Sequence, residues 1–550
     1  MSAPDALVGI VGAGPVGLTC ALRLASLGVD SLVLEAEPGL RKRGSKACCI
    51  QGDVVEVLDK VGCAAPIATE GVPWHVAHTY VGGREIDTTI FPRPSGFEPF
   101  INISQFRIEQ ILLERVAGSP LAGVAWNHRV SSVSQDGEGV EVEAATPDGP
   151  RRLRFRHLVA CDGVRSALRD LVGVEWTGYS HGDLFLITDL RARLPFARER
   201  HFHYDPPFNP GRQVIMHPQP RDMWRIDWQL PPDVDIDAER RTGDLDQRIR
   251  TVIGAVDYEI DWLSTYRFHQ RVVDRFRVGN VFFAGDAAHA LPPYGARGMN
   301  SGIQDADNLA WKLALVVRGQ AADSLLDTYH TERYAAALEN LRVTEGTIRF
   351  MVPPTPLRRL GRNLLLALAP SVKPLRRRVN SGRMAEPFVY ADSPIVDPGG
   401  SPLAGHLAPD GAVASDGGPR RLREALGAGF LGMYVGADPG EASRFVAQVL
   451  AAGEPVPVHP VVVLPPGVEG HRVPAGATLL RDAEGTLGAA YNPAGEAMWY
   501  LVRPDGHIAA ARPGHAAGDL GGVLASCIGG RAIAGLAGSR RPEAVNHAGA

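Results

Sequence analysis

The chain has 550 residues, more than one hydrophobic core normally serves, so we expect two or three domains. Its 57 basic and 61 acidic side chains give a net charge of −4, which offers no overall field to attract nucleic acid or an anionic membrane. The 6 cysteines lack CxxC or metal-ligand spacing, which predicts reduced, mostly buried thiols and no metal site.

The N-terminal segment alternates between strand-like and helix-like patterns. Residues 7–11 form a buried apolar run, residues 14–27 have helical periodicity and stop at Gly28, and residues 29–35 form a second apolar run. This order predicts a β-α-β unit. Because no basic region or cleavage site precedes the first strand, we expect no secretory signal and a cytoplasmic protein.

The middle of the chain is predicted to be rich in strands. Ser104 is placed to cap the helix that follows it. Residues 140–155 alternate apolar and charged side chains around a turn, which predicts a hairpin leading into a buried strand at 158–161. Residues from about 180 to 270 are rich in aromatic and β-branched residues interrupted by prolines, as expected for an antiparallel sheet in a second domain.

The remainder is predicted to contain another buried strand, two helices, a linker and a third domain. The strand covers 278–284, and helices follow at 299–317 and from Leu326. Prolines and arginines between 351 and 394 indicate a linker with helices along the surface rather than a core. A β-α-β-β-β pattern between 430 and 510 then predicts the third domain.

The linker contains the most apolar run of the chain, residues 364–369, which is far too short to cross a bilayer. The arginines that flank it are Arg358, Arg359, Arg376, Arg377 and Arg378. Two interpretations stay open, namely a helix on a membrane surface and a helix packed across the linker.

A GxGxxG pattern, formed by Gly12, Gly14 and Gly17, lies at the predicted turn from the first strand into the first helix. With 62 glycines in the chain, about one match to the bare pattern is expected by chance. The evidence for a dinucleotide site is therefore the position of the pattern at the strand-to-helix turn. A pyrophosphate must reach the free N–H groups of a helix N-terminus, and a side chain at Gly14 would block it. Glu35 ends the second strand, where a carboxylate can accept hydrogen bonds from a ribose. The segment predicts a dinucleotide site for FAD or NAD, with a ligand-free glycine turn as the alternative.

Two later segments distinguish between these cofactors. Residues 158–169 resemble the Asp-Gly motif of class A flavin monooxygenases of aromatic rings, the group that includes para-hydroxybenzoate hydroxylase and phenol hydroxylase. Residues 281–289 are similar to the Gly-Asp motif of the same family, and the match continues through 292–306. The resemblance spans about residues 7–345 and implies that the cofactor is FAD.

The resemblance also implies a set of residues for the FAD site. In this family the Asp-Gly motif supports the flavin and the approach of NAD(P)H, and the aspartate of the Gly-Asp motif hydrogen-bonds the ribityl chain. The helix that begins near Met299 would direct its free N–H groups at an anionic reduced flavin. The expected FAD-binding residues are Gly12, Gly14, Gly17, Glu35, Ser45, Lys46, Gln105, Asp162, Gly163, Arg169, Gly285, Asp286, Pro293, Gly298, Met299 and Asn300.

Two further features concern the family pattern. Relatives often have glutamine at the position of Arg297, so a guanidinium is expected near the flavin here. The C-terminal region resembles the thioredoxin-like domain of phenol hydroxylase and 3-(3-hydroxyphenyl)propionate hydroxylase relatives. Because this region has no CxxC, dithiol chemistry is excluded.

The predicted fold is therefore α/β, a Rossmann-like FAD-binding domain with an inserted antiparallel β-sheet substrate domain and a C-terminal thioredoxin-like domain. The expected boundaries are 1–180 and 270–350 for the FAD-binding domain, 181–269 with part of 75–100 for the substrate domain, 351–394 for the linker helices, 395–538 for the thioredoxin-like domain and 539–550 for a tail.

The resemblance implies a monooxygenase that consumes NADPH or NADH as a transient co-substrate. It would hydroxylate a phenolic or hydroxylated heteroaromatic ring through a flavin C4a-hydroperoxide. The protein would have to exclude water, hold the ring and help ionise a phenol. The candidate catalytic or substrate-contacting residues are Arg225, His203, Tyr204, His217 and Tyr294, with a core or surface role as the alternative for each of the first four.

The expected partners are a small aromatic substrate and O₂, with no nucleic acid and no integral membrane segment; a homodimer or larger homo-oligomer is compatible with the sequence. Two other functions stay open: a flavoprotein dehydrogenase or reductase without oxygen insertion, and a flavin-containing aromatic-binding protein. A flavin-dependent halogenase is disfavoured, because the tryptophans between 224 and 231 are not spaced as WxWxIP. A small phenol, a hydroxypyridine and a polycyclic intermediate all remain open as substrates.

Overall fold

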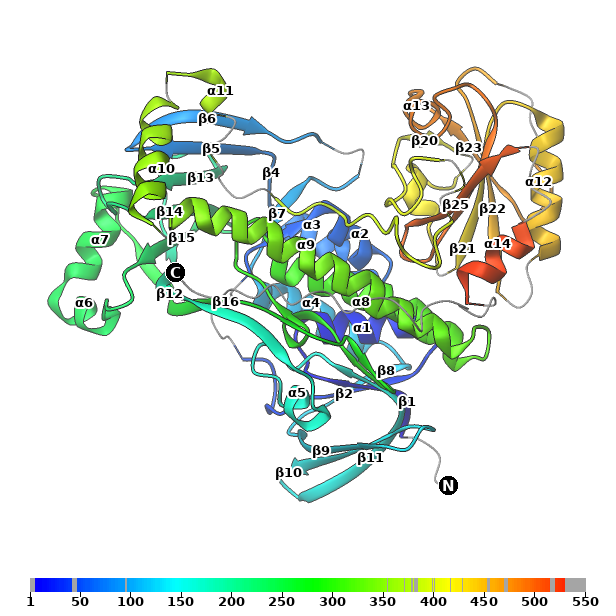
Figure 1. Ribbon diagram of the computed structural model, residues 1–550, viewed down its shortest axis with the longest axis horizontal. Helices are drawn as coiled ribbons and strands as arrows, with labels where there is room; N and C mark the ends of the chain where they lie inside the picture. Colours follow the sequence, from blue (N-terminus) through cyan, green and yellow to red (C-terminus); the bar gives the residue numbers. More distant parts are fainter. Residues whose placement is uncertain are drawn as a thin grey trace.

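The computed structural model (Figure 1) describes most of the chain. The described residues are 5–41, 47–93, 96–353, 355–369, 371–376, 379, 384–397, 399, 401–415, 417–427, 429–452, 456–468, 473–514 and 520–529.

A mixed sheet with a parallel centre forms the core of the N-terminal domain (Figure 1). Its order, β17-β18-β11-β1-β2-β8 with β10 and β9 added beside β11, brings strands far apart in sequence together. β1 pairs in parallel with β2 and β11, and β11 pairs in parallel with β18, so the carboxyl ends of these strands meet at one edge. The strands are β1 (Ala6–Val11), β2 (Ser31–Leu34), β8 (Ala122–Ala125), β9 (Arg129–Gln135), β10 (Val140–Thr146), β11 (Gly149–Ala160), β17 (Arg277–Val278) and β18 (Val281–Phe283).

Helices and a small sheet complete this domain. α1 contacts α4 and α8 over the central sheet, which confirms the predicted β-α-β unit. The helices are α1 (Pro15–Ser26), α2 (Gly52–Asp59), α3 (Ala64–Glu70), α4 (Gln105–Ala117), α5 (Ala167–Val172), α8 (Arg297–Val317) and α9 (Asp327–Met351), with 3₁₀ turns η1 (Gly285–Ala287) and η2 (Asp323–Leu326). The small sheet has the order β3-β7-β4, with β3 (Cys49–Gln51), β4 (Val72–Trp74) and β7 (Phe100–Asn102).

A second, mostly antiparallel sheet has the order β19-β16-β12-β15-β14-β13-β5-β6. Its strands are β5 (Val76–Val81), β6 (Arg84–Ile90), β12 (Trp176–Arg191), β13 (Arg200–Tyr204), β14 (Gln213–Gln219), β15 (Met223–Leu230), β16 (Glu259–Val273) and β19 (His289–Ala290). β12 and β16 pair along nearly their whole length, from the N-terminal domain into this sheet. The expected boundaries at 181 and 269 therefore fall inside two continuous strands.

Side-chain alternation assigns the two faces of this sheet. On β15, Trp224, Ile226 and Trp228 are buried against the cluster that contains Ile249 of helix α7 (Asp244–Ile253), beside α6 (Ile236–Thr242). The intervening Arg225 and its neighbours two residues apart must point to the opposite face. That face is turned toward the N-terminal domain.

The linker differs from the expectation of a segment that avoids the core. Its helices are α10 (Pro356–Leu368) and α11 (Lys373–Arg376), and they lie beside the second sheet (Figure 1). However, Met384 and Tyr390 are buried, and Arg333 of α9 donates to the Tyr390 hydroxyl at 2.8 Å. Met384 and Tyr390 pack into the interior of the protein because apolar side chains and a hydrogen-bond donor contact them there.

The C-terminal domain is built on a third sheet with the order β20-β23-β22-β21-β24-β25. Its elements are β20 (Val413–Ala414), η3 (Leu422–Ala425), β21 (Phe430–Val435), α12 (Pro439–Ala452), β22 (Val458–Leu464), β23 (Thr478–Asp482), α13 (Thr486–Tyr491), β24 (Met498–Val502), β25 (Ile508–Pro513) and α14 (Leu520–Cys527). The β-α-β-β-β prediction omitted β23 and α13, which are short and lack a long periodic pattern. The predicted tail at 539–550 lies outside the described residues.

A buried ion cluster joins the C-terminal domain to α8 and α9. Arg503 donates to both carboxylate oxygens of Glu332 and also pairs with Asp505, and Lys312 donates to Glu332 at 2.6 Å. Burial opposes ionisation of Glu332, but the charges of Arg503 and Lys312 outweigh it and hold its pKa below the usual range. The cluster is stable only when each charge keeps its partner.

Neither a metal-binding cluster nor a membrane-spanning helix is found among the described residues. No group of three or more His, Cys, Asp or Glu side chains among them is arranged to hold a metal ion. Nor does any helix of this part of the chain have the length and apolarity needed to cross a bilayer.

We expect Arg503→Met to destabilise the protein by about 3–5 kcal/mol, because two carboxylates would stay buried with too little positive charge. Urea unfolding would measure this loss. The matched control is Arg444→Met, at an exposed arginine of the same domain, which should leave stability nearly unchanged. Equal unfolding curves for the two variants would contradict the role assigned to the cluster.

Candidate active site

A single cavity of about 1270 Å³ connects the three glycine- and aspartate-containing segments with the inner face of the second sheet. Gly14, Asp162 and Asp286 all line it. Its volume exceeds the roughly 300–1,000 Å³ typical of a pocket for one drug-sized ligand. The cavity therefore has room for a large cofactor and a second molecule.

The glycine turn shapes one end of this cavity. A Cβ atom at Gly12, which has φ +106°, would lie 2.4 Å from the carbonyl oxygen of Cys161, and one at Gly17 would lie 2.0 Å from the Gly12 carbonyl oxygen. Gly14 also lines the cavity, and a Cβ there would meet no atom within 4 Å. Gly12 and Gly17 are thus required by close packing, whereas Gly14 keeps space open at the start of α1.

Glu35 lies where the β-α-β unit predicts, after the end of β2 and on the cavity wall. Its Oε2 accepts from the backbone N–H of Ala13 at 2.8 Å, which ties the carboxylate to the glycine turn. Gln105 lines the same region and donates to Glu109 at 2.8 Å. Ser45 and Lys46 lie outside the described residues.

The Asp-Gly segment places two residues on the wall and a third behind it. Asp162 and Gly163 line the cavity. Asp162 Oδ1 is buried and has no hydrogen-bond partner, and burial raises the pKa of this carboxyl group. Arg169 does not line the cavity; it donates to the carbonyl oxygens of Val164 at 2.6 Å and Ala287 at 3.0 Å. Arg169 is therefore a positioning residue that joins the Asp-Gly and Gly-Asp segments.

The Gly-Asp segment is held from behind by Asp305 of α8. Asp286 and Ala284 line the cavity, whereas Gly285 between them packs against Val16. Asp305 Oδ2 accepts from the Gly285 N–H at 2.9 Å and is hydrogen-bonded to His289 Nε2 at 2.7 Å. Burial opposes ionisation of Asp305, but Arg333 and His289 outweigh it and lower its pKa.

The start of α8 forms the middle of the cavity wall. Pro293, Gly298 and Met299 line it, whereas Asn300 lies behind and donates to the carbonyl oxygen of Cys49 at 3.1 Å. Arg297 also lines the cavity, and its guanidinium donates to the Met384 carbonyl at 3.2 Å. The guanidinium expected near the flavin is thus anchored to the linker.

The inner face of the second sheet forms the other end of the cavity. Its lining includes Phe185, Ile215, Tyr266, Phe268, His217 and Asp227. Tyr294 lies across from this face and accepts a hydrogen bond from Gln213. This chamber has an aromatic and apolar wall, and the polar or charged side chains of Arg200, His217, Asp227, Thr265 and Arg267 also line it.

Two of the five candidate catalytic residues line the chamber. They are His217, whose Nδ1 is buried without a hydrogen-bond partner, and Tyr294. Burial, together with the charges of Arg200 and Arg225, lowers the pKa of His217 well below its ordinary value, so the ring is neutral.

The other three candidates do not line the cavity. His203 stacks on Tyr80 with ring centroids 4.4 Å apart, on the opposite face of the sheet. Tyr204 is buried in an aromatic cluster behind the chamber. Arg225 has the predicted orientation, opposite to Ile226, but its guanidinium donates to both Asp189 oxygens at 2.7 and 2.8 Å.

Asp227 and the buried Arg200 are chamber residues that were not among those predicted from the sequence, and Asp227 is the acidic one. Its Oδ1 is buried and has no hydrogen-bond partner. Burial raises the pKa of this carboxyl group to about 7, although Arg225 lowers it. The signal was present in the sequence, because alternation along β15 places Asp227 on the same face as Arg225.

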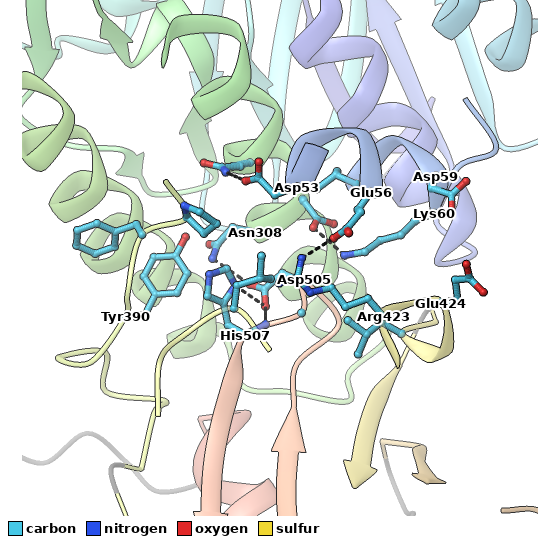
Figure 2. A pocket seen from close by; sticks show the side chains of 18 of the residues that line it. Asp53, Glu56, Asp59, Lys60, Asn308, Tyr390, Arg423, Glu424, Asp505 and His507 are labelled. Atoms are coloured by element: carbon cyan, nitrogen blue, oxygen red, sulfur yellow. Dashed lines mark hydrogen bonds and ion pairs between the residues drawn. The ribbon is translucent and has the colours of Figure 1, made fainter. Parts of the chain in front are cut away.

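A smaller cavity of about 180 Å³ lies between the N-terminal and C-terminal domains (Figure 2). Its walls are mostly charged: Arg423 donates to Glu56 at 2.7 Å, and Lys60 donates to Asp307 at 2.9 Å. Burial raises the pKa of Asp53 there to about 6. Because its lining includes none of the residues of the large cavity, this smaller cavity is a separate polar space at the interface between the two domains.

Comparisons with known proteins agree with this arrangement. The family model described as "FAD binding domain" matches residues 5–344. The chain is 30% identical over 522 residues to 6-methylpretetramide 4-monooxygenase of Streptomyces rimosus, with 91% of this chain and 90% of that protein covered. It is 28% identical over 536 residues to 3-(3-hydroxy-phenyl)propionate/3-hydroxycinnamic acid hydroxylase of Escherichia coli strain 55989, with 95% and 94% covered. The structure of a ternary complex of aklavinone-11 hydroxylase with FAD and aklavinone matches with a TM-score of 0.72 and 25% identity, over 96% of this chain and 100% of that one.

We expect Gly14→Val to fold normally but to lose bound FAD. The backbone of Gly14 is extended (φ −76°, ψ −179°), so valine is tolerated there, whereas its side chain would fill the space at the start of α1. Flavin absorbance per mole of purified protein would measure the loss. The control is Gly521→Val, at an open glycine in α14, which should retain FAD. A Gly14→Val protein with full flavin content would contradict this assignment.

Proposed function

Because this chain belongs to the family of FAD-dependent aromatic hydroxylases, we propose that it uses NAD(P)H and O₂ to hydroxylate a phenolic ring held in the large cavity. The comparisons confirm the predicted family, the enzyme class and FAD as cofactor. The observation that carries the proposal is the continuity of one cavity from the glycine turn to the aromatic chamber. A cofactor and a ring can meet only if both reach the same space.

The residues of the cavity fit FAD. Gly14, Gly163 and Gly298 all line it, and a Cβ at each would meet no atom within 4 Å. The start of α1 offers free N–H groups to the pyrophosphate, and Glu35 offers a carboxylate to the ribose. Asp286 lies further along the wall, where it would accept hydrogen bonds from the ribityl chain. When bound, FAD would supply the redox chemistry, in which two electrons from NAD(P)H reduce O₂ so that one oxygen atom enters the ring and the other leaves as water.

The chamber residues would hold the ring and keep water out. Phe185 stacks on Phe268 with ring centroids 3.7 Å apart, and both form an apolar wall. Tyr294 meets Phe268 edge to face at 5.6 Å, and its hydroxyl is already held by Gln213. An aromatic substrate lying against this wall would be desolvated and fixed in orientation before it reacts.

Asp227 and His217 are the groups that would handle the proton of a ring hydroxyl. A phenol reacts with an electrophilic oxygen more readily when it is ionised. Asp227 Oδ1 would accept that proton, since it is buried on the chamber wall, has no partner and titrates near pH 7. His217, kept neutral by burial and by Arg200 and Arg225, would orient the hydroxyl by a hydrogen bond.

We further propose that the C-terminal domain is thioredoxin-like. The sheet order β22-β21-β24-β25, in which β22 is parallel to β21 and β24 is antiparallel, supports this, as do α12 between β21 and β22 and α14 after β25. Its single cysteine, Cys527, is buried, and burial raises the pKa of the thiol to about 12. The domain would therefore serve a structural role.

The overall reaction is tested by incubating the FAD-loaded protein with NADH or NADPH and a panel of single-ring and fused-ring phenols. We expect an effective substrate to accelerate NAD(P)H oxidation and to gain one oxygen atom by mass. Oxidation that yields only hydrogen peroxide or a dehydrogenated product would favour a dehydrogenase or reductase. No stimulation by any phenol would favour an aromatic-binding protein.

Asp227→Asn should lower kcat with the preferred phenol by about 100-fold, within the range of roughly 10²–10⁴ for a lost general base. In the parent protein, activity should rise as pH increases through about 7, because the carboxyl group must be deprotonated to accept the proton. The variant should lose this limb of the pH profile while retaining FAD. The exposed Asp233→Asn should keep both rate and profile. An unchanged pH profile in Asp227→Asn would assign the proton transfer to another group.

A further inference from the structure

One helix, α10, carries four of its six leucines on the side that faces away from the protein. The residues of this face are Leu357, Leu360, Leu364 and Leu368, spaced by three or four positions. Their exposed fractions are 78%, 67%, 59% and 43%. An amphipathic helix of a globular protein normally turns such a stripe toward the core. The outward stripe therefore indicates an external partner.

Contacts on the other side of α10 fix this orientation. Leu366 is buried in a cluster of aromatic and aliphatic side chains that includes Met351 of α9. Arg362 donates from Nη1 to the backbone carbonyl of Met351 at 3.0 Å. Because both the packed leucine and the arginine hold the inner side, the leucine face stays turned outward.

The sequence around α10 carries positive charge only. From 346 to 385 there is no Asp or Glu, although the whole chain has a net charge of −4. The nine basic residues in this stretch are Arg349, Arg358, Arg359, Arg362, Lys373, Arg376, Arg377, Arg378 and Arg383. Within α10, the arginines lie beside or opposite the leucine face, which is the pattern of helices that bind at a membrane interface.

We propose that α10 docks the protein reversibly on an anionic lipid surface. The leucine face enters the boundary between headgroups and acyl chains, and the exposed Arg358 and Arg359 extend toward the lipid phosphates from the polar side of the helix. A second copy of the chain fits this face less well. A two-fold interface brings the same patch of each copy together, so two sets of arginines would face each other without acidic partners.

The position of α10 connects this surface with the large cavity. The helix lies beside the second sheet, at the end of the molecule away from the C-terminal domain (Figure 1). The cluster that holds Leu366 also contains Phe185, Phe268 and Tyr294, which line the chamber. Docking would thus set the chamber next to the lipid, a favourable place for an apolar aromatic substrate. This consequence rests on the proposed function, whereas lipid docking itself does not.

Vesicle flotation of the purified FAD-loaded protein tests the proposal without any substrate. We expect the protein to float with phosphatidylcholine vesicles that contain phosphatidylglycerol, and to remain largely unbound with pure phosphatidylcholine. Raising the salt concentration should weaken binding, because the attraction to the headgroups is screened. The double variant Leu360→Gln/Leu364→Gln should bind on the order of tenfold more weakly. Arg358→Gln/Arg359→Gln should also bind more weakly and depend less on salt.

The control is Leu450→Gln, at an exposed leucine of α12 in the other domain, which should float like the parent protein. Flavin content shows that each variant is folded, and sedimentation gives its oligomeric state. Failure of the parent protein to bind anionic vesicles would overturn the proposal, as would full binding by the double leucine variant. A dimer that dissociates in the double leucine variant, without vesicle binding, would assign the face to a second copy of the chain.

Discussion

The carboxylate of Asp305 is the contact on which the arrangement of the cavity depends. It is fully buried on α8, where it accepts from the Gly285 N–H and is hydrogen-bonded to His289. Its other oxygen accepts from Arg333 of α9 at 2.6 Å, and Arg333 also donates to Tyr390 of the linker. The Asp305 carboxylate therefore connects the turn that carries Asp286, the helices α8 and α9, and the linker segment that contains Tyr390. A buried carboxylate is stable only when its charge is fully paired. Loss of one of these contacts would therefore weaken the connection between all of these parts.

The glycine turn between β1 and α1 could be predicted from the sequence because it depends on local chain geometry. Glycines at a strand-to-helix turn, as at Gly12 and Gly17, follow from close backbone approach around one β-α-β unit. The contacts of the residues behind the cavity wall were harder to predict from the sequence. Arg169 and Asn300 were predicted to bind the cofactor; in the structure they do not line the cavity, and they donate to backbone carbonyls of segments far away in the chain. Such partners are set by tertiary packing, which no short motif encodes.

The chamber illustrates the same limit more sharply. Alternation on β15 placed both Arg225 and Asp227 on the inner face, but it does not say which of them is neutralised. That is decided by the pairing of β12 with β15, which sets Asp189 directly opposite Arg225 and leaves Asp227 unpaired. For His203, the face depends on the register of β13 against β14 and β5. The linker helix α10 falls in the stretch predicted to contain linker helices, and Pro356 occupies its first turn after the cap Thr355, where proline is well tolerated.

The length of β12 and β16 has a mechanical consequence. Their ladder runs from Trp176, against which Arg169 lies, to Arg191 at the far end of the second sheet. Two continuous strands therefore connect the two domains, and their pairing is interrupted at the junction by a register shift between Ser180 and Leu184. A swing of one domain against the other would have to bend both strands at this shift. The connection 291–296, between β19 and α8, contributes Leu291, Pro293, Tyr294, Gly295 and Ala296 to the lining of the cavity. The distance between the glycine turn and the aromatic chamber is therefore set by strands that belong to both domains.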